Sequence, residues 1–168
     1  MKIRFIYSLA LLLVTSLAQA ESKPYLSTRV ISMELANKLA MSAAQTCRKK
    51  GYQVAVSVVD RGGNLLSVVR DPLAGAHTID VSLKKAQTAA TFQTDTITMQ
   101  KQGEEFAGLR FAKDVLIIGG GIPVRVGGHF YGAVAVSGAP GKKVTGDIDH
   151  ECAQAGIDVI KEAIEFAE

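Results

Sequence analysis

Two β-hairpin signatures constrain the fold of this chain more than any other feature of its sequence. In the first, apolar and polar residues alternate over residues 52–59, and a turn containing Gly62-Gly63 leads into a second strand at 65–70. In the second, residues 122–126 and 130–137 are separated by another Gly-Gly turn. Strands joined by tight turns pair antiparallel, whereas parallel strands need long crossover connections. The sequence therefore predicts an antiparallel sheet and argues against a doubly wound parallel fold.

Helical spacing predicts helices before, between and after these strands. Ser32 is placed to cap the first helix, and Gly51 is placed to end it. Asp147 is expected to cap the last helix, whose first turn is acidic, as the helix dipole prefers. Helices layered on an antiparallel sheet define an α+β domain. The expected helices cover residues 34–50, 77 or 78 to 92, 94–113 (one or two short helices) and 147–168, and a short fifth strand is expected at 115–118.

The first twenty residues have the features of a signal peptide. Lys2 and Arg4 precede an apolar run over residues 5–17, and Ala18-Gln19-Ala20 offers the small-residue pattern that signal peptidase cleaves. The run is shorter than the roughly 20 apolar residues that a membrane-spanning helix needs. We therefore expect cleavage after Ala20, export to a bacterial periplasm and no stable membrane insertion, with an uncleaved membrane anchor as the alternative.

The rest of the chain is long enough for one domain with a core of its own. We expect a loose N-terminal arm over residues 21–31 and a single domain over residues 32–168. The chain has 19 basic and 16 acidic residues, and the leader holds two of the basic and none of the acidic ones, so the net charge beyond it is +1. A charge this low provides no nucleic-acid-binding footprint.

Cys47 and Cys152 are the two cysteines of the chain. Export would place them in an oxidising compartment, where a pair of cysteines can form a disulfide. Both fall on expected helices at opposite ends of the domain, so a disulfide and two buried thiols both fit the sequence. A structural zinc site is not expected, because no histidine cluster accompanies the cysteines.

The sequence offers no catalytic constellation. The triple glycine at 119–121 is followed by no Lys-Ser or Lys-Thr and leads into a strand, which argues against a phosphate-binding loop. No serine lies in a Gly-x-Ser-x-Gly turn, and neither cysteine has a paired histidine nearby. The acidic segment 147–151, with His150, could bind a metal loosely or form a solvated helix start. His77 is the most notable histidine, because it lies between a Pro/Gly loop and an alanine-rich helix where a flat ligand would fit.

A series of segments in the same order resembles the GlcG/HbpS family, from about Ser32 to the C-terminus. The resemblance implies an α-β-α layered sandwich with a five-stranded antiparallel sheet (profilin-like), homo-oligomers and, for exported members, haem binding. Related domains of the PduO type bind haem or a corrinoid. The segments are Ser57-Val58-Val59-Asp60-Arg61-Gly62-Gly63-Asn64-Leu65, Gly75-Ala76-His77-Thr78, Lys85-Ala86-Gln87-Thr88-Ala89, Gly119-Gly120-Gly121-Ile122-Pro123-Val124, Gly132-Ala133-Val134-Ala135-Val136-Ser137-Gly138, and Asp147-Ile148-Asp149 with Cys152-Ala153-Gln154-Ala155-Gly156.

The resemblance and the position of His77 together predict an exported protein that scavenges, buffers or senses haem. The haem would lie in a cleft near the His77 loop and the following helix, with His77 as the iron ligand and basic residues on the propionates. An enzyme acting on a small oxidised metabolite or on haem itself, and a corrinoid-binding module, remain alternatives. The expected binding residues are His77, Thr78, Arg70, Lys84 and Lys85, and the walls could come from Phe92, Met99, Phe106, Leu109 and Phe111, which could equally be ordinary core.

Overall fold

A four-stranded antiparallel sheet forms the centre of the fold. The computed structural model describes residues 23–167. The strands follow the order β2-β1-β4-β3 across the sheet, and every neighbouring pair is antiparallel. Their bounds are Ala55–Val59 for β1, Leu65–Arg70 for β2, Gly121–Val126 for β3 and His129–Ser137 for β4.

Both hairpins predicted from the sequence are present. β1 pairs with β2 and β3 pairs with β4, while β4 also pairs with β1 and so joins the two hairpins into one sheet. In the first turn, the Asp60 carboxylate accepts hydrogen bonds from the backbone N–H groups of Gly62 and Asn64, which fixes the reversal of the chain. β1 and nearly all of β4 are buried, as befits the two central strands.

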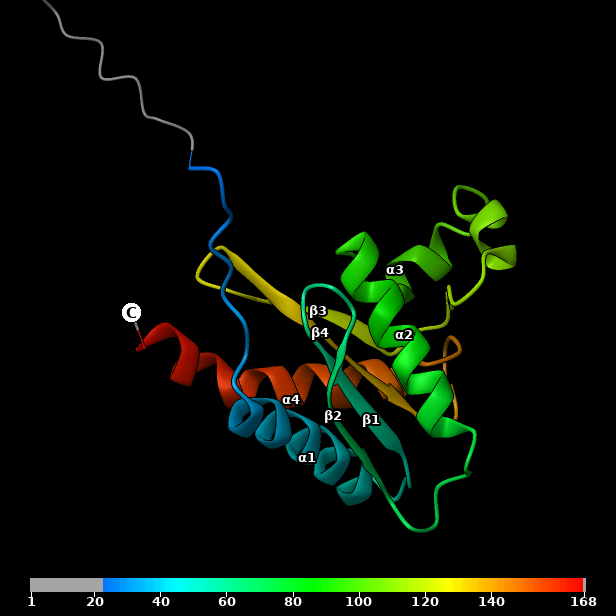
Figure 1. Cartoon of the computed structure of the whole chain (residues 1–168). Helices are drawn as coiled ribbons and strands as arrows, with labels where there is room; N and C mark the ends of the chain where they lie inside the picture. The colour runs from blue at the N-terminus through cyan, green and yellow to red at the C-terminus, as the bar shows by residue number, and fades with distance from the viewer. Residues whose placement is uncertain (1–22, 168) are drawn as a thin grey trace, which may run out of the picture.

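Helices cover both faces of the sheet, so the α+β layered architecture is confirmed (Figure 1). α1 and α4 pack together against one face, over a core of strand valines and helix leucine, isoleucine and alanine side chains. α2 packs against the other face, where small alanine side chains let the helix approach β1 and β4 closely. The bounds are Met33–Lys49 for α1, Thr78–Phe92 for α2, Thr96–Lys101 for α3, Ala107–Phe111 for the 3-10 helix η1 and Asp147–Glu165 for α4.

The five-stranded sheet that the resemblance implied is wrong, because residues 115–118 do not form a strand. The backbone N–H groups of this segment and of the residue after it bond to side chains of two helices, not to a neighbouring strand. The N–H of Leu116 donates to Thr88 Oγ1 of α2 at 2.8 Å, and the N–H of Gly119 donates to Gln100 Oε1 of α3 at 2.7 Å. These bonds give the two backbone N–H groups partners on α2 and α3. The segment adds no strand to the sheet, and β3 is an edge strand. A profilin-like arrangement stays a prediction.

The two predicted helix caps have different outcomes. Ser32 caps α1, since its hydroxyl accepts a hydrogen bond from the N–H of Leu35 at 3.2 Å. Asp147 does not cap α4, because Gly146 holds the cap position with a φ of 82°, a conformation that suits glycine. The Asp147 carboxylate instead accepts the N–H of Lys143 at 2.7 Å and ties the preceding loop to the first turn of the helix.

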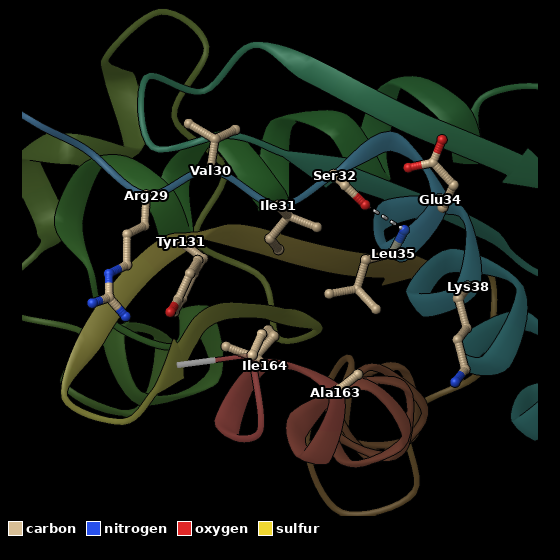
Figure 2. Close-up of a pocket in the computed structure, with 11 residues that line it drawn as sticks. Arg29, Val30, Ile31, Ser32, Glu34, Leu35, Lys38, Tyr131, Ala163 and Ile164 are labelled. Carbon is tan, nitrogen blue, oxygen red and sulfur yellow. Dashed lines mark hydrogen bonds between the residues drawn. The ribbon is translucent and has the colours of Figure 1, made fainter.

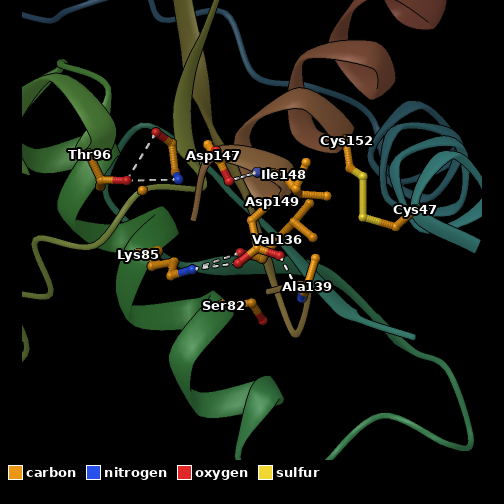
Figure 3. Close-up of polar contacts among 12 residues, drawn as sticks. Cys47, Ser82, Lys85, Thr96, Val136, Ala139, Asp147, Ile148, Asp149 and Cys152 are labelled. Carbon is orange, nitrogen blue, oxygen red and sulfur yellow. Dashed lines mark hydrogen bonds and ion pairs between the residues drawn. A yellow bond between two sulfur atoms is a disulfide. The ribbon is translucent and has the colours of Figure 1, made fainter. Parts of the chain in front are cut away.

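A disulfide joins Cys47 of α1 to Cys152 of α4, with the two Cα atoms 5.5 Å apart (Figure 3). The sequence alone left a disulfide and two buried thiols open, because it could not show whether the two helices touch. Both cysteines are fully buried in the core that α1 and α4 share. The bond links residues 105 positions apart and fastens the two helices to one another.

The N-terminal arm is described from residue 23 and follows an irregular path to α1. It ends at Ile31, whose side chain is buried against the core. The expected signal peptide lies outside the described residues. Within residues 23–167, none of the helices combines the length and the hydropathy needed to cross a membrane.

Candidate functional site

A cavity of about 630 Å³ lies where the arm, the start of α1 and the end of α4 come together, and we call it the arm cavity. Its walls are mainly apolar and come from segments far apart in the sequence. Figure 2 shows these side chains around the space between the arm and α4. The apolar lining residues are Val30, Ile31, Leu35, Ala163, Ile164 and Ala167.

Tyr131 places a polar group in this apolar surrounding. It lies on β4, on the face covered by α1 and α4, and its side chain points toward the end of α4 in Figure 2. The residue is 6% exposed, and its ring belongs to the core. Within residues 23–167 the Tyr131 hydroxyl has no hydrogen-bond partner, although it reaches the cavity surface. The ring is therefore held in the core, while the hydroxyl oxygen is not one of the buried atoms that lack a partner.

Charged side chains lie around the same cavity. Arg29 and Lys38 contribute two cations, and Glu34 contributes one carboxylate. Hydrogen bonds from the Glu34 backbone N–H and from the Ser32 hydroxyl lower the pKa of Glu34, so this carboxylate stays ionised. Cationic side chains in the described lining suit an apolar ligand that carries anionic groups.

The structure places most of the residues predicted from the sequence on the opposite face of the sheet, around α2. His77 is exposed at the end of the loop before α2. Thr78 is buried, and its hydroxyl donates to the Gly75 carbonyl at 2.6 Å. The Arg70 guanidinium donates to the carbonyls of Pro72 and Ala74 and so holds the same loop in place.

The two predicted lysines have different surroundings. Lys84 is partly exposed, forms an ion pair with Asp80 at 3.0 Å and lines a polar cavity of about 550 Å³ beside the first hairpin turn. Lys85 is 2% exposed, and its Nζ lies 3.0 Å from Asp149 Oδ2 and 3.1 Å from the Val136 carbonyl (Figure 3). The structure therefore brings His77, Thr78 and Arg70 together around one loop and turns Lys85 into the interior.

Burial dominates the electrostatics of the Lys85–Asp149 pair. Removal from water lowers the pKa of Lys85 and raises the pKa of Asp149, while the attraction between the two charges opposes both shifts. The pair joins α2 to α4, and Asp149 also accepts the Ala139 N–H at 3.0 Å. Helical periodicity places Lys85 on the inward face of α2, but its partner is 64 residues away and no local pattern identifies it.

The face of the sheet covered by α2 includes exposed apolar side chains, whereas the arm cavity lies on the face covered by α1 and α4. Leu65 and Val68 of β2 and Ile79 of α2 are each partly exposed there, since α2 packs mainly on β1, β4 and β3. Among the aromatic and aliphatic side chains proposed as walls, Met99 is fully buried and Phe111 is almost fully exposed. These two residues therefore do not form a common wall.

The acidic segment at the start of α4 does not gather metal ligands. Among residues 23–167, no group of three or more His, Cys, Asp or Glu side chains is arranged to bind a metal ion. His150 is half-buried, its Nδ1 atom is buried without a hydrogen-bond partner among these residues, and burial lowers its pKa. Asp147 binds backbone N–H groups, and Asp149 binds Lys85. The segment does begin α4, but it is not the solvated helix start that the sequence suggested, because Asp149 is buried against Lys85.

Sequence reasoning missed the arm cavity and Tyr131. The arm looked like a polar to mixed segment, and Tyr131 looked like an ordinary strand residue. One signal was available: the apolar pair Val30-Ile31 directly precedes the Ser32 cap, a position from which an apolar side chain often packs back onto the helix. The contribution of α4 could not be seen, because Ile164 lies more than 130 residues further along the chain.

Comparisons with known proteins place this architecture in a family. The model of the family described as "Haem degrading protein HbpS-like" matches residues 31–158. The protein GlcG of Escherichia coli K12 is 29% identical over 109 residues, covering 64% of this chain and 81% of GlcG. The crystal structure of a double mutant of Streptomyces reticuli HbpS has a TM-score of 0.76 and 32% identity, covering 84% of this chain and 94% of HbpS.

A more distant solved structure shares the fold alone. The crystal structure of a PduOC:Heme complex has a TM-score of 0.69 and 23% identity, covering 79% of this chain and 96% of PduOC. The family match covers about three quarters of the chain and includes all of the strands. The resemblance seen in the sequence motifs is therefore confirmed, and the chain belongs to the HbpS-like family.

Proposed function

We propose that this protein binds haem or a closely related tetrapyrrole, and that the macrocycle lies in the arm cavity. The family to which the chain belongs is described as haem degrading, which supports a tetrapyrrole ligand. The observation that carries the proposal is a cavity with mainly apolar walls and two cationic side chains in its lining. A tetrapyrrole with propionates needs both features.

The residues present fit such a ligand. The volume of about 630 Å³ lies within the range of roughly 300–1,000 Å³ that is usual for small-molecule sites. The Ile31 side chain of the arm points toward α4, and Ala163 and Ile164 of α4 lie on the other side of the space, so a flat ring could be covered on both faces. Lys38 could bind a propionate while its stem stays along the α1 surface. Haem would bring its iron to this site and with it ligand binding or redox chemistry.

The loop with His77 is the other place where haem could bind, and it is the one predicted from the sequence. His77 supplies an exposed imidazole at the start of α2, two residues before the exposed side chain of Ile79. The arm cavity and the His77 loop lie on opposite faces of the sheet, so substitutions can test them independently. The sequence-based prediction that His77 binds the iron is therefore the alternative that the variants below test.

The decisive experiment is a haem titration of matched variants, followed by the Soret band. Ala163 is exposed on α4 and lines the arm cavity, so Ala163→Trp should fill the space without disturbing the core. Glu162→Trp adds the same ring to the neighbouring exposed position, which is not part of the cavity lining, and serves as the control. We expect Ala163→Trp to weaken haem binding at least about tenfold, the factor that 1.4 kcal/mol represents, and Glu162→Trp and His77→Ala to keep the parent's affinity.

The outcomes separate the two positions. If His77→Ala alone loses the Soret shift, haem binds at the loop before α2, as the sequence predicted. If the parent protein shows no Soret shift at stoichiometric haem, the proposed function itself is wrong. A shift with cobalamin in place of haem would favour a corrinoid-binding module.

Haem turnover is a second candidate function, favoured by the description of the family as haem degrading. Among the described residues that line the arm cavity, the side chains that could act as acid, base or nucleophile form no recognisable catalytic group. Loss of the Soret band with release of iron on addition of a reductant, faster than in a solution of haem and albumin, would assign this activity. A stable reduced spectrum would leave binding as the function.

We also propose that the protein is exported and cleaved after Ala20. The basic start, the apolar run and the small residues before position 21 support export, and the Cys47–Cys152 disulfide suits an oxidising compartment. N-terminal sequencing of a periplasmic extract should begin at Glu21. A full-length product retained in the membrane would contradict the cleavage.

Assembly into a homo-oligomer is part of the proposal as well. Exposed apolar side chains such as Leu73 and Phe166 are suited to symmetric packing between copies. Light scattering at micromolar concentration should give a multiple of the monomer mass. A monomer mass under these conditions would argue against it.

A further inference from the structure

We infer that the Tyr131 hydroxyl oxygen is the ligand that the protein offers to the haem iron. This inference rests on the proposed function and assigns a role within the arm cavity that the binding of the ring alone does not require. Three observations carry it: the hydroxyl has no partner, it faces the cavity, and it is the uncharged oxygen there that no local hydrogen bond engages.

The unpartnered hydroxyl is the first observation. Tyr131 is 6% exposed, so its ring is held by the core and has little freedom to swing into water. Among residues 23–167 no donor or acceptor meets its hydroxyl. The hydroxyl oxygen is not one of the buried atoms that lack a partner, so it is open to the cavity and a ligand can reach it.

The competing donors of the cavity are already engaged or poorly suited. The Ser32 hydroxyl accepts the Leu35 N–H as the α1 cap. Glu34 accepts hydrogen bonds from its own backbone and from Ser32, and it lies on the exposed side of the first helical turn. Lys38 is an exposed ammonium, which has no lone pair for iron while protonated. Within the described lining of the cavity there is no His, Cys or Met side chain.

The chemistry of a tyrosine oxygen suits ferric haem. Tyrosine is an established axial ligand type for haem iron, as in catalase. On binding, the phenol oxygen forms a bond to ferric iron and the phenol proton passes to solvent, so no oxidant or reductant is consumed. The cations of Arg29 and Lys38 in the same lining favour the negative charge that develops on the oxygen.

One neighbouring residue must be tested beside Tyr131. His129 lies two positions earlier on β4 and therefore on the same face of the strand. It is exposed and is not part of the cavity lining. An imidazole from this position would give a spectrum unlike that of a phenolate, so the two ligands can be told apart.

The experiment compares ferric haem spectra and affinities of the full chain with three variants. Tyr131→Phe removes the oxygen and keeps the ring in the core. Tyr52→Phe is the matched control, because Tyr52 follows the other end of α1 and also packs against the same core. His129→Ala tests the neighbouring histidine. Each protein is also titrated with metal-free protoporphyrin, which reports on the apolar walls and the propionate contacts without iron.

We expect Tyr131→Phe to lose the phenolate-to-iron charge-transfer band and to bind ferric haem about tenfold more weakly or worse, the size of effect typical when a metal site is damaged. Its affinity for metal-free protoporphyrin should stay near that of the parent, and Tyr52→Phe and His129→Ala should keep the parent's spectrum. Haem binding by Tyr131→Phe with an unchanged spectrum would overturn the inference and leave the proposed function intact. Equal losses for haem and for protoporphyrin would also overturn it, since Tyr131 would then be part of the wall. A parent that binds neither compound would refute the proposed function and the inference together.

Discussion

The Lys85 ammonium of α2 lies 3.0 Å from the Asp149 carboxylate of α4, and both side chains are almost fully buried. Because α2 and α4 cover opposite faces of the sheet, this ion pair connects the two helical layers of the domain (Figure 3). The Val136 carbonyl at the end of β4 accepts a further hydrogen bond from Lys85. The buried ammonium of Lys85, on α2, therefore contacts both β4 and α4.

Asp149→Asn should destabilise the protein strongly. It removes the negative partner and leaves the Lys85 ammonium buried and uncompensated, a situation that costs about 3–5 kcal/mol in the free energy of unfolding. Urea denaturation followed by far-UV circular dichroism measures the loss. The double variant Lys85→Met/Asp149→Leu should lose less than Asp149→Asn, because an apolar pair leaves no unpaired charge behind.

The neighbouring lysine provides the control for this prediction. Lys84 is partly exposed and pairs with Asp80 within the same helix, so Lys84→Met should change the urea midpoint little. If Asp149→Asn unfolds at the same urea concentration as the parent, the ion pair does not hold the layers together.

Reduction of the Cys47–Cys152 disulfide should lower the stability of the folded protein. The bond closes a loop across 105 residues, and a loop of this length corresponds to about 4–5 kcal/mol in the chain-entropy model. Thermal melts with and without dithiothreitol measure the effect. The variant Cys47→Ala/Cys152→Ala should melt near the reduced parent and should not respond to dithiothreitol, and a response there would show that the reductant acts elsewhere.

Asp147 should stabilise the protein at neutral pH and lose this contribution in acid. Backbone N–H groups, first of all that of Lys143, hold the pKa of Asp147 down to about 2. Since the folded pKa lies below the unfolded value of about 4, the contribution is complete above that value and disappears as the pH falls from about 4 to 2. Asp147→Asn should therefore melt below the parent at pH 7, and the two melting temperatures should approach one another as the pH falls from about 4 to 2. Asp158→Asn, an exposed change on the same helix, should show no such convergence.

The sequence predicted local structure better than distant contacts. The hairpins followed from alternation and glycine turns, and Ser32 was identified as a cap because its bond to Leu35 spans three residues. The prediction of a fifth strand was wrong because the apolar tetrapeptide at 115–118 resembles a strand in its sequence. The side chains of Thr88 and Gln100, which bond to the backbone in this region, are distant in sequence and leave no local signal.

The candidate site shows the same limit. His77 could be singled out by its local surroundings, and the family resemblance could be read from short motifs. The arm cavity required three segments to be placed together, and the partner of Lys85 required a register between α2 and α4. Neither relation leaves a periodic signal in the sequence, so only the packed structure reveals them.

His150 should make the protein less stable as the pH falls through about 6.5. Burial of the imidazole lowers its pKa in the folded protein, and its Nδ1 atom has no hydrogen-bond partner among residues 23–167. The unfolded chain, with an ordinary histidine pKa of about 6.5, then binds more protons than the folded one. Stability is therefore fully present above this value and decreases below it. Melting temperatures between pH 7.5 and 5.5 should fall less steeply for His150→Gln than for the parent, and an NMR titration of His150 should give a pKa below 6.5. Parallel slopes for the two proteins would show that the buried imidazole does not set this pH dependence.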